Sequence, residues 1–486
     1  MMFSRIRVLF FILAHIILAI LLIFLFSNPI SEHIYPKSVE ATEVYLENGA
    51  TPQFQDHVKP TEDTLSVTAK SSGQPGNMGL EIQLRDTAKS SRSTIANHKL
   101  IYQSESKSNQ TRLDIRYQSE SKSNQTRLDV RSTTFEQTTW KSLRVADFTA
   151  EPQWKTEEHY ILVPSSHQTT CPMSIKIKSR NVSWLQQKFL RDITIFMDAR
   201  HFTDKEWKRL GHFIPPFGWM ELQYPVVKEV VSVLPVIADQ QLLLAEKSGK
   251  VPHCVNCAVV GNGGILNGSR MGKEIDSHDY VFRVNGAVTK GYEDDVGNRT
   301  SFYGFTAYTM LASLMLLKRK GFSTIPHDKE TKYILFTEGQ RDFEWLKALQ
   351  QNKEITNSIL KQYRLRPRDD FGNSFDLKNL LVVHPDFSRY LKNRFLRSTT
   401  LDGKYWKFYR PSTGALVLLT ALHLCDQINA YGFMTDDFKE YANHYYDKMK
   451  TKVDFYINHD FMLEKDLWAR LHEENIIKLF KRTKGL

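Results

Sequence analysis

The stretch that decides the predicted fold is Cys257-Ala-Val-Val-Gly-Asn-Gly-Gly-Ile-Leu266. Its first four residues are apolar and predict a buried strand, and a glycine-rich turn follows at once. Glycines at such a turn let the backbone approach a ligand phosphate closely, and Asn262 adds a polar side chain suited to a nucleotide. The same pattern also fits a tight turn that binds nothing. A dinucleotide site is a further alternative, but it needs a third glycine where Leu266 stands.

Apolar runs and helical patterns alternate from about Glu151 onward. The strands predicted from these runs are 257–260, 333–336, 380–383 and 428–433, and the predicted helices are 342–351, 387–397 and 413–424. Strands that alternate with helices favour an α/β fold, with a mostly parallel, Rossmann-like sheet flanked by helices. We therefore expect one folded domain over residues 151–486.

The amino terminus carries a long apolar segment. Residues 8–26 are apolar with one exception, and this length is sufficient to cross a bilayer once. Arg5 and Arg7 precede the segment and the next basic residue is Lys37, so the positive-inside rule places residues 1–7 in the cytosol and the rest in the lumen. A cleaved signal peptide is the alternative, but its apolar core is shorter and ends at small residues. We expect an uncleaved anchor and type II topology.

The segment that follows has a different composition. Residues 27–150 are rich in Ser, Thr, Gln, Lys and Glu and show no sustained period. Such a composition cannot bury enough apolar surface to offset the entropy of ordering the chain, so we expect a disordered lumenal stem. Within it, residues 102–131 consist of two copies of a 15-residue unit. Two copies of so polar a unit do not make a solenoid.

Sequons for N-glycosylation occur in the stem and in the expected domain. Each copy of the repeat contains Asn-Gln-Thr, at Asn109 and Asn124, and both are predicted glycosylation sites in a lumenal chain. Glycosylation is also expected at Asn181 and Asn298. Glycosylation of Asn298, and of the further sequon at Asn267, requires that the fold does not bury the asparagine side chain.

Four cysteines lie in the part of the chain that is expected to be lumenal. The lumen is oxidising, so disulfides are expected, and four cysteines allow three pairings. Cys254 and Cys257 form a C-x-x-C, which is also a spacing of zinc and redox sites. However, no second C-x-x-C or histidine pair stands at a useful distance. We interpret the cysteines as structural.

Four blocks of sequence resemble the sialylmotifs of the animal sialyltransferases. The large motif is matched by the glycine turn followed by Ser277-His-Asp-Tyr-Val-Phe-Arg-Val-Asn285 and Asp295-Val-Gly-Asn-Arg-Thr-Ser-Phe-Tyr-Gly304. The small motif is matched by Tyr409-Arg-Pro-Ser-Thr-Gly-Ala-Leu416, Leu424-Cys-Asp-Gln427 and Tyr431-Gly-Phe433. His444-Tyr-Tyr-Asp447 resembles motif III, and His459 with Glu464 resembles the H-x4-E of the very small motif. Within the family the chain is most similar to the GalNAc α2,6-sialyltransferases, from about Cys171 onward.

This resemblance implies a fold, an activity and a location. The fold is the sialyltransferase variant of the GT-A-like fold in a single catalytic domain. The activity is transfer of sialic acid from CMP-sialic acid to O6 of GalNAc linked to Ser or Thr, with inversion and with neither a metal nor another cofactor. The implied partners are mucin-type O-glycoproteins and the Golgi membrane. A net charge of +11 suits an anionic ligand or an acidic membrane surface, but a basic surface is usually only solvated, and no nucleic-acid partner is expected.

The resemblance also assigns roles to histidines and a carboxylate. His459 is the implied general base for the acceptor hydroxyl, a task that suits histidine because its ordinary pKa lies near neutral pH. Glu464 is the implied orienting or structural carboxylate. His444 is implied to contact the donor phosphate and to ease its departure.

Donor binding is assigned to two further groups of residues. Asn262 and Asn285 match asparagines that bind the CMP portion in the family. Ser412, Thr413 and Gly414 begin the predicted helix 413–424, where serine or threonine ordinarily only caps the helix. The same geometry offers free backbone amides to an anion, so we interpret these residues as a cap that also binds the donor.

The resemblance further implies a disulfide between Cys257 and Cys425, which leaves Cys171 to pair with Cys254. The chain departs from the family at two positions. Relatives often carry serine where Gly263 stands, and some carry an aromatic residue where Arg410 stands.

Two observations bear on the alternatives. No two aspartates stand two residues apart, so the chain lacks the Asp-x-Asp element with which many metal-dependent glycosyltransferases hold a nucleotide diphosphate. All residues implied as base or donor ligands are present, which favours an active enzyme over a catalytically silent protein that binds CMP-sugars or glycans. A sialyltransferase with another acceptor or linkage is a further alternative.

Overall fold

The computed structural model describes residues 99–103, 114–118, 143–164, 169–238, 240, 254–372, 375–450, 453 and 455–482. The chain divides into two units. The smaller unit spans 43–139, and its described part is one antiparallel strand pair, β1 (Lys99–Gln103) with β2 (Asp114–Gln118). A single pair of strands is marginal in water, so the disordered stem stays a prediction. The predicted anchor at 8–26 and the sequons at Asn109 and Asn124 lie outside the described residues.

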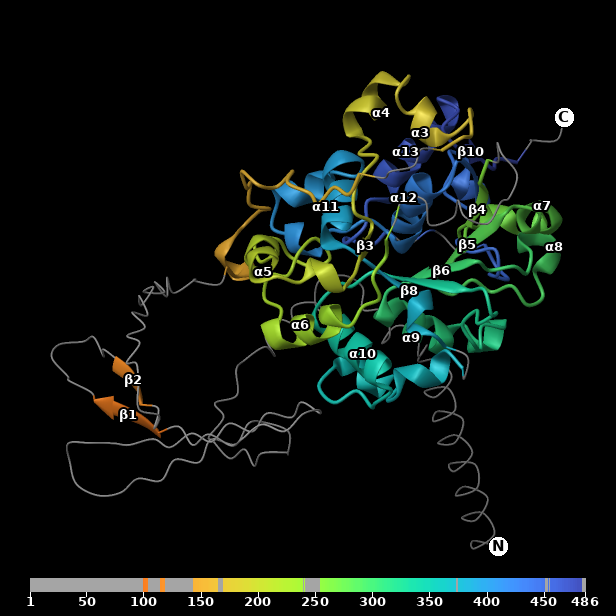
Figure 1. Ribbon diagram of the computed structural model, residues 1–486. Helices are drawn as coiled ribbons and strands as arrows, with labels where there is room; N and C mark the ends of the chain where they lie inside the picture. Colours follow the sequence, from red (N-terminus) through yellow and green to blue (C-terminus); the bar gives the residue numbers. More distant parts are fainter. Residues whose placement is uncertain are drawn as a thin grey trace, which may run out of the picture. The chain divides into compact units, whose positions relative to one another are not determined.

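The larger unit is built on one sheet (Figure 1), with the strand order β10-β9-β4-β5-β6-β7-β8-β3. All neighbouring strands are parallel except β3, which runs antiparallel to β8. This confirms the predicted α/β class with a mostly parallel sheet. The strands are β3 (Phe196–Met197), β4 (Asn256–Val260), β5 (Tyr280–Val284), β6 (Phe302–Phe305), β7 (Lys332–Leu335), β8 (Leu380–Val383), β9 (Gln427–Tyr431) and β10 (Lys478–Leu479).

Helices cover both faces of this sheet. In Figure 1 the helices α11, α12 and α13 lie on one side of the strands, and α9 and α10 lie on the other. The helices are α3 (Ile175–Lys178), α4 (Ser183–Lys188), α5 (Asp204–Leu210), α6 (Tyr224–Ser232), α7 (Gly272–Asp276), α8 (Glu293–Val296), α9 (Ala307–Leu316), α10 (Gln340–Gln351), α11 (Pro385–Arg394), α12 (Thr413–Leu424) and α13 (Phe461–Glu473).

Strand β4 shows why its sequence is an unbroken apolar run. Cys257 and Val259 point into the core that contains α12, whereas Ala258 and Val260 point into the core on the opposite face. A strand that is covered on both faces needs apolar residues at every position rather than at alternate ones. Helix α12 is apolar around its whole circumference for the same reason, since it is almost entirely buried.

The folded part of the larger unit begins before residue 151. Leu143, Val145 and Phe148 pack against a small core that includes Trp406. The Phe148 ring contacts the Trp406 ring edge to face, with 6.4 Å between the ring centroids. This short segment therefore belongs to the domain and not to the predicted stem.

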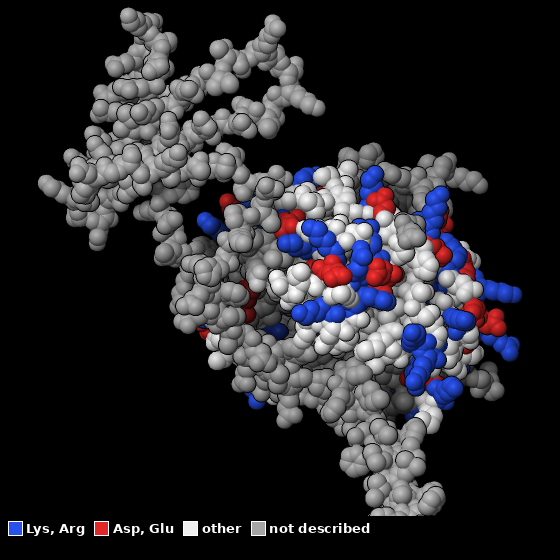
Figure 2. Space-filling view, turned by 90° about the horizontal axis from the view of Figure 1, so that it is seen from below, with Lys and Arg blue, Asp and Glu red and all other residues white. Residues whose placement is uncertain are grey.

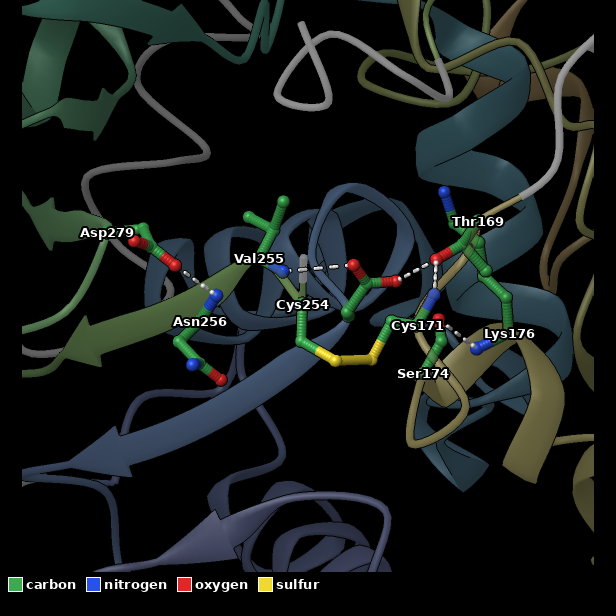
Figure 3. Close-up of a disulfide and its surroundings, with 9 residues drawn as sticks. Thr169, Cys171, Ser174, Lys176, Cys254, Val255, Asn256 and Asp279 are labelled. Atoms are coloured by element: carbon green, nitrogen blue, oxygen red, sulfur yellow. Dashed lines mark hydrogen bonds between the residues drawn. A yellow bond between two sulfur atoms is a disulfide. The ribbon is translucent and has the colours of Figure 1, made fainter. Parts of the chain in front are cut away.

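The two disulfides join Cys257 to Cys425 and Cys171 to Cys254, which confirms the predicted pairing and the structural interpretation. Figure 3 shows the second disulfide within a network of hydrogen bonds. The Asp426 carboxylate accepts hydrogen bonds from the Thr169 hydroxyl (2.7 Å) and from the Val255 N–H (3.0 Å). The segment that precedes α3 is thereby held against the start of β4 and the end of α12.

Charges of both signs lie on the surface of the domain. Figure 2 shows one face on which Lys and Arg side chains are interspersed with Asp and Glu side chains. The sequons at Asn181, Asn267 and Asn298 all lie at exposed positions, so burial does not block Asn267 or Asn298. Among the described residues, no helix combines the length and the apolar character that a membrane crossing requires.

Candidate functional site

The carboxyl edge of the sheet contains a point at which the strand order reverses. After β4 the chain adds β5, β6, β7 and β8 on one side, and then returns to place β9 on the other side of β4. In open parallel sheets, ligands bind in the crevice outside such a switch point. The glycine turn that follows β4 lies at this position.

The glycine turn packs directly against the turn that follows β9. A Cβ atom added at Gly261 or Gly263 would lie 2.6 Å from the Gly432 carbonyl oxygen, and one added at Gly264 would lie 2.0 Å from the Ala442 carbonyl oxygen. Close packing of protein backbone is therefore one reason for these glycines, and the approach of this turn to a ligand phosphate stays a prediction. Their effect is to bring residues of the large motif, the small motif and motif III together.

Asn262 and Asn285 follow the ends of the neighbouring strands β4 and β5. The Oδ1 atoms of both side chains are buried and have no hydrogen-bond partner within the described structure. Asn285 also has a φ of 44°, a left-handed conformation that asparagine tolerates better than most residues. A buried carboxamide oxygen without a partner is costly unless a ligand supplies a donor. The two asparagines therefore have the properties of ligand-binding residues.

His444 is held at the same edge by the backbone and by an ion pair. His444 forms an isolated β-bridge with Gly263, and its Nδ1 lies 3.1 Å from Asp447 Oδ2. Burial raises the pKa of Asp447, but its contacts with His444 and Lys320 outweigh that effect and hold the pKa well below its usual range. An ionised Asp447 orients the imidazole through its contact with Nδ1.

His459 lies in the loop that precedes α13, and its ring is oriented by backbone. The Nδ1 atom lies 2.8 Å from the Arg410 carbonyl oxygen, which requires a proton on Nδ1. Desolvation lowers the pKa of His459 to about 4, and the Arg410 guanidinium acts in the same direction. The ring is therefore neutral near neutral pH, and its Nε2 lone pair accepts a hydrogen bond of 3.2 Å from Asn458 Nδ2. This is the state that a general base requires.

Glu464 contacts Ser412 rather than His459. The Ser412 N–H and hydroxyl each donate a hydrogen bond of 2.7 Å to the Glu464 carboxylate. The Ser412 Oγ also accepts from the Ala415 N–H and so caps α12. Both donors of Ser412 are thus occupied within the protein, whereas the N–H groups of Thr413 and Gly414 have no acceptor in the described part of the chain.

Burial raises the pKa of Glu464 to about 7, and this makes stability depend on pH. A carboxyl with a raised pKa in the fold contributes stability at low pH that is lost as pH rises toward 7. Glu464→Gln imitates the protonated form, so the variant should gain up to about 3 kcal/mol relative to wild type between pH 5 and pH 8. Thermal unfolding at both pH values measures this difference.

A matched control for that experiment is Glu473→Gln, which changes an exposed carboxylate on the same helix. The control should leave the pH dependence of unfolding as in wild type. A Glu464→Gln variant whose stability relative to wild type is the same at pH 5 and pH 8 would contradict the raised pKa.

The turn after β9 connects the two groups of site residues. Gly432 contacts the glycine turn, and the ring of the next residue, Phe433, lies 3.7 Å from the position of a Cβ at Gly414. The asparagines and His444 are thus placed on one side of this turn and the start of α12 on the other. The structure brings the residues of all four motifs to one edge of the sheet.

Two residues of the site were not predicted from the sequence. The Arg410 carbonyl holds His459, and the Arg410 side chain forms an ion pair with Glu338, which follows β7. The position of Arg410 beside the small motif is a signal that could have identified it. Glu338 has no local signal. Among the described residues, no group of three or more His, Cys, Asp or Glu side chains could hold a metal ion.

Comparison with known proteins identifies the family. Residues 196–476 match the model of glycosyltransferase family 29 (sialyltransferase). The chain is 56% identical over 343 residues to alpha-N-acetylgalactosaminide alpha-2,6-sialyltransferase 1 of Gallus gallus, a match that covers 71% of this chain and 61% of the relative. It is 43% identical over 294 residues to alpha-N-acetylgalactosaminide alpha-2,6-sialyltransferase 2 of Homo sapiens, covering 60% of this chain and 78% of the relative.

A crystal structure of a mammalian sialyltransferase is similar with 27% identity and a TM-score of 0.47, and the match covers 65% of this chain and all of that chain. The match to the Gallus gallus relative spans about three fifths of that protein's length. The family match itself extends over more than half of the chain and includes every candidate catalytic and donor-binding residue described above. This chain therefore belongs to glycosyltransferase family 29, the sialyltransferases.

Proposed function

We propose that the protein transfers sialic acid from CMP-sialic acid to O6 of GalNAc that is α-linked to Ser or Thr. The observation that carries the proposal is the convergence of the candidate base His459, the unpartnered oxygens of Asn262 and Asn285, and the free amides of α12 at one edge of the sheet. The names of the relatives support the linkage and the acceptor sugar.

Donor binding follows from the chemistry of these groups. The Asn262 and Asn285 oxygens are acceptors, which suits the amino and hydroxyl donors of a cytidine. The N–H groups of Thr413 and Gly414 at the positive end of α12 suit an anionic group, either the phosphate or the sialic acid carboxylate. His444 Nε2 donates to the phosphate as negative charge develops on it. Ser412 acts through the helix cap, because Glu464 occupies its donors.

In the proposed transfer step, the bond between sialic acid C2 and the phosphate oxygen breaks, and its electron pair leaves with CMP. The acceptor O6 forms a bond to C2 on the opposite face, so the configuration at C2 inverts. His459 Nε2 takes the proton from O6 as that bond forms, which it can do because burial keeps the ring neutral. The leaving group is a monophosphate that His444 and helix amides can stabilise, so we propose a metal-independent reaction.

The proposed setting is the Golgi lumen. The apolar segment 8–26, with basic residues before it, supports a type II anchor, and the composition of residues 27–150 supports a stem between the membrane and the catalytic domain. The acceptors would be mucin-type O-glycoproteins. Glycosylation is proposed at Asn109, Asn124, Asn181 and Asn298.

The test uses the full-length protein in detergent with CMP-sialic acid, with and without EDTA. The acceptors are glycopeptides that carry GalNAc, galactosylated GalNAc or a sialylated core. We expect product on O6 of GalNAc at a rate that EDTA does not change. Binding of CMP without transfer to any acceptor would indicate the silent binding protein instead, and product at another hydroxyl would indicate a different linkage. Loss of transfer in EDTA would contradict metal independence.

A further inference from the structure

The backbone of Arg410 forms hydrogen bonds with the loop that carries His459. Its backbone N–H donates a hydrogen bond of 2.9 Å to the Asn458 carbonyl oxygen, and its carbonyl oxygen lies 2.8 Å from His459 Nδ1. The ring therefore depends on the position of the Arg410 peptide. A displacement of this peptide would move Nε2 away from the acceptor.

The Arg410 side chain ties this peptide to another part of the fold. Its Nε lies 2.5 Å from Glu338 Oε1, and the second Glu338 oxygen accepts a hydrogen bond of 2.9 Å from Arg341 Nη2. The Glu338 side chain is only 11% exposed, and that of Arg410 is 27% exposed. Glu338 follows β7, so the ion pair connects the sheet edge to the loop before α12.

The contacts keep Glu338 ionised in spite of its burial. Burial alone would raise the pKa of Glu338, but the guanidinium groups of Arg410 and Arg341 outweigh this and lower it. A buried carboxylate that is paired on both oxygens has little freedom to reorient, and removing one partner of such a pair leaves an uncompensated charge. The pair is therefore a rigid link.

We propose that the Glu338–Arg410 ion pair positions His459 for catalysis by fixing the Arg410 carbonyl that holds His459 Nδ1. This inference rests on the proposed function, because the ion pair contributes to catalysis only if His459 is the general base. Glu338 and Arg410 are positioning residues, since neither is placed against the reacting atoms.

The charges that face His459 provide a readout beyond stability. Arg410 lowers the pKa of His459 and Glu338 raises it. The His459 ring contacts the neutral side chains of Asn458 and Phe461, and the carboxylate of the adjacent Asp460 accepts hydrogen bonds from the Ser398 hydroxyl and the Leu463 N–H. Glu338→Gln should therefore shift the titration of His459 to lower pH, and Arg410→Gln should shift it to higher pH. A purely structural role predicts no such opposite shifts.

The experiment uses the full-length chain with histidine labelled at the ring carbon, and NMR follows the tautomer and titration of His459. The signal is assigned with His459→Asn. We expect Glu338→Gln and Arg410→Gln to shift the titration in opposite directions and to weaken the preference for a proton on Nδ1. Both should reduce kcat by up to about a hundredfold, whereas Arg410→Lys, which retains the charge, should recover part of the loss.

A matched control is Arg397→Gln, which removes the ion pairs of Arg397 with Asp402 and Glu151, both outside this network. The control should leave the His459 titration and kcat unchanged. Unchanged titration and tautomer in both Glu338→Gln and Arg410→Gln would overturn the inference, and so would shifts in the same direction. If the wild-type protein transfers no sialic acid, the proposed function fails, but a weakened preference for a proton on Nδ1 in both variants would still establish that the ion pair positions His459.

Discussion

Replacing His459 with alanine is expected to reduce kcat for sialyl transfer by about a thousandfold, within the range typical of a lost general base. The variant removes the nitrogen that would accept the proton of the acceptor hydroxyl. CMP binding should remain near wild type, because the proposed donor contacts lie on other residues. His459 itself contacts the Arg410 carbonyl oxygen and the Asn458 side chain. Steady-state kinetics and CMP titration measure the two effects separately.

A matched control for this variant is His327→Ala, which removes an exposed histidine whose Nδ1 contacts the nearby Ile325 carbonyl. The control should retain wild-type kcat. The pH profile of wild-type kcat/KM should fall on the acid side as His459 takes up a proton, with a midpoint near its pKa of about 4. A His459→Ala enzyme with kcat close to wild type would remove this residue from the role of base.

The substitution Gly264→Ala should abolish CMP binding and lower the melting temperature. The added methyl group would lie 2.0 Å from the Ala442 carbonyl oxygen, a backbone atom that cannot move aside by a change of rotamer. The glycine turn and the segment before His444 would have to separate, at a cost of about 3 kcal/mol or more. Because the same turn carries Asn262, the expected loss of donor affinity exceeds what the loss of stability alone would cause.

Gly403→Ala adds the same methyl group in open space, where no atom lies within 4 Å, and Gly403 has a φ of −132° that alanine adopts readily. This control should bind CMP and unfold as the wild type does. Calorimetric titration with CMP and thermal unfolding distinguish the two variants. If Gly264→Ala binds CMP with wild-type affinity, then the packing of the two turns does not shape the donor site.

The strands predicted from the sequence are β4, β7, β8 and β9, whereas the fully buried strand β6 was not predicted. Strand β4 is an apolar run, and so are most of β7, β8 and β9. Strand β5 was not predicted as a strand because Arg283 interrupts its apolar residues. The buried Arg283 guanidinium donates hydrogen bonds to the Val296 and Arg299 carbonyl oxygens. These residues are distant from Arg283 in the sequence and lie beside it only in the folded structure.

In the site, too, residues within local motifs could be predicted, whereas contacts between residues distant in the sequence could not. The motifs identified His459, His444 and Asn262 as candidates, and their chemical roles stay predictions. The hydrogen bonds between Glu464 and Ser412 join residues 52 positions apart, and the ion pair of Glu338 with Arg410 joins residues 72 positions apart. No local pattern encodes such pairs, because they depend on how α12, α13 and the end of β7 pack together.

The two disulfides impose an order on the oxidation of the nascent chain. Cys257 emerges three residues after Cys254, but its partner Cys425 follows 168 residues later, which corresponds to roughly 10 to 30 s of synthesis. During that interval Cys257 is a free thiol beside the newly formed bond between Cys171 and Cys254, and a neighbouring thiolate attacks such a bond by exchange. In an oxidising compartment, exchange between Cys257 and this bond is therefore available until α12 has been synthesised and Cys425 has docked against β4.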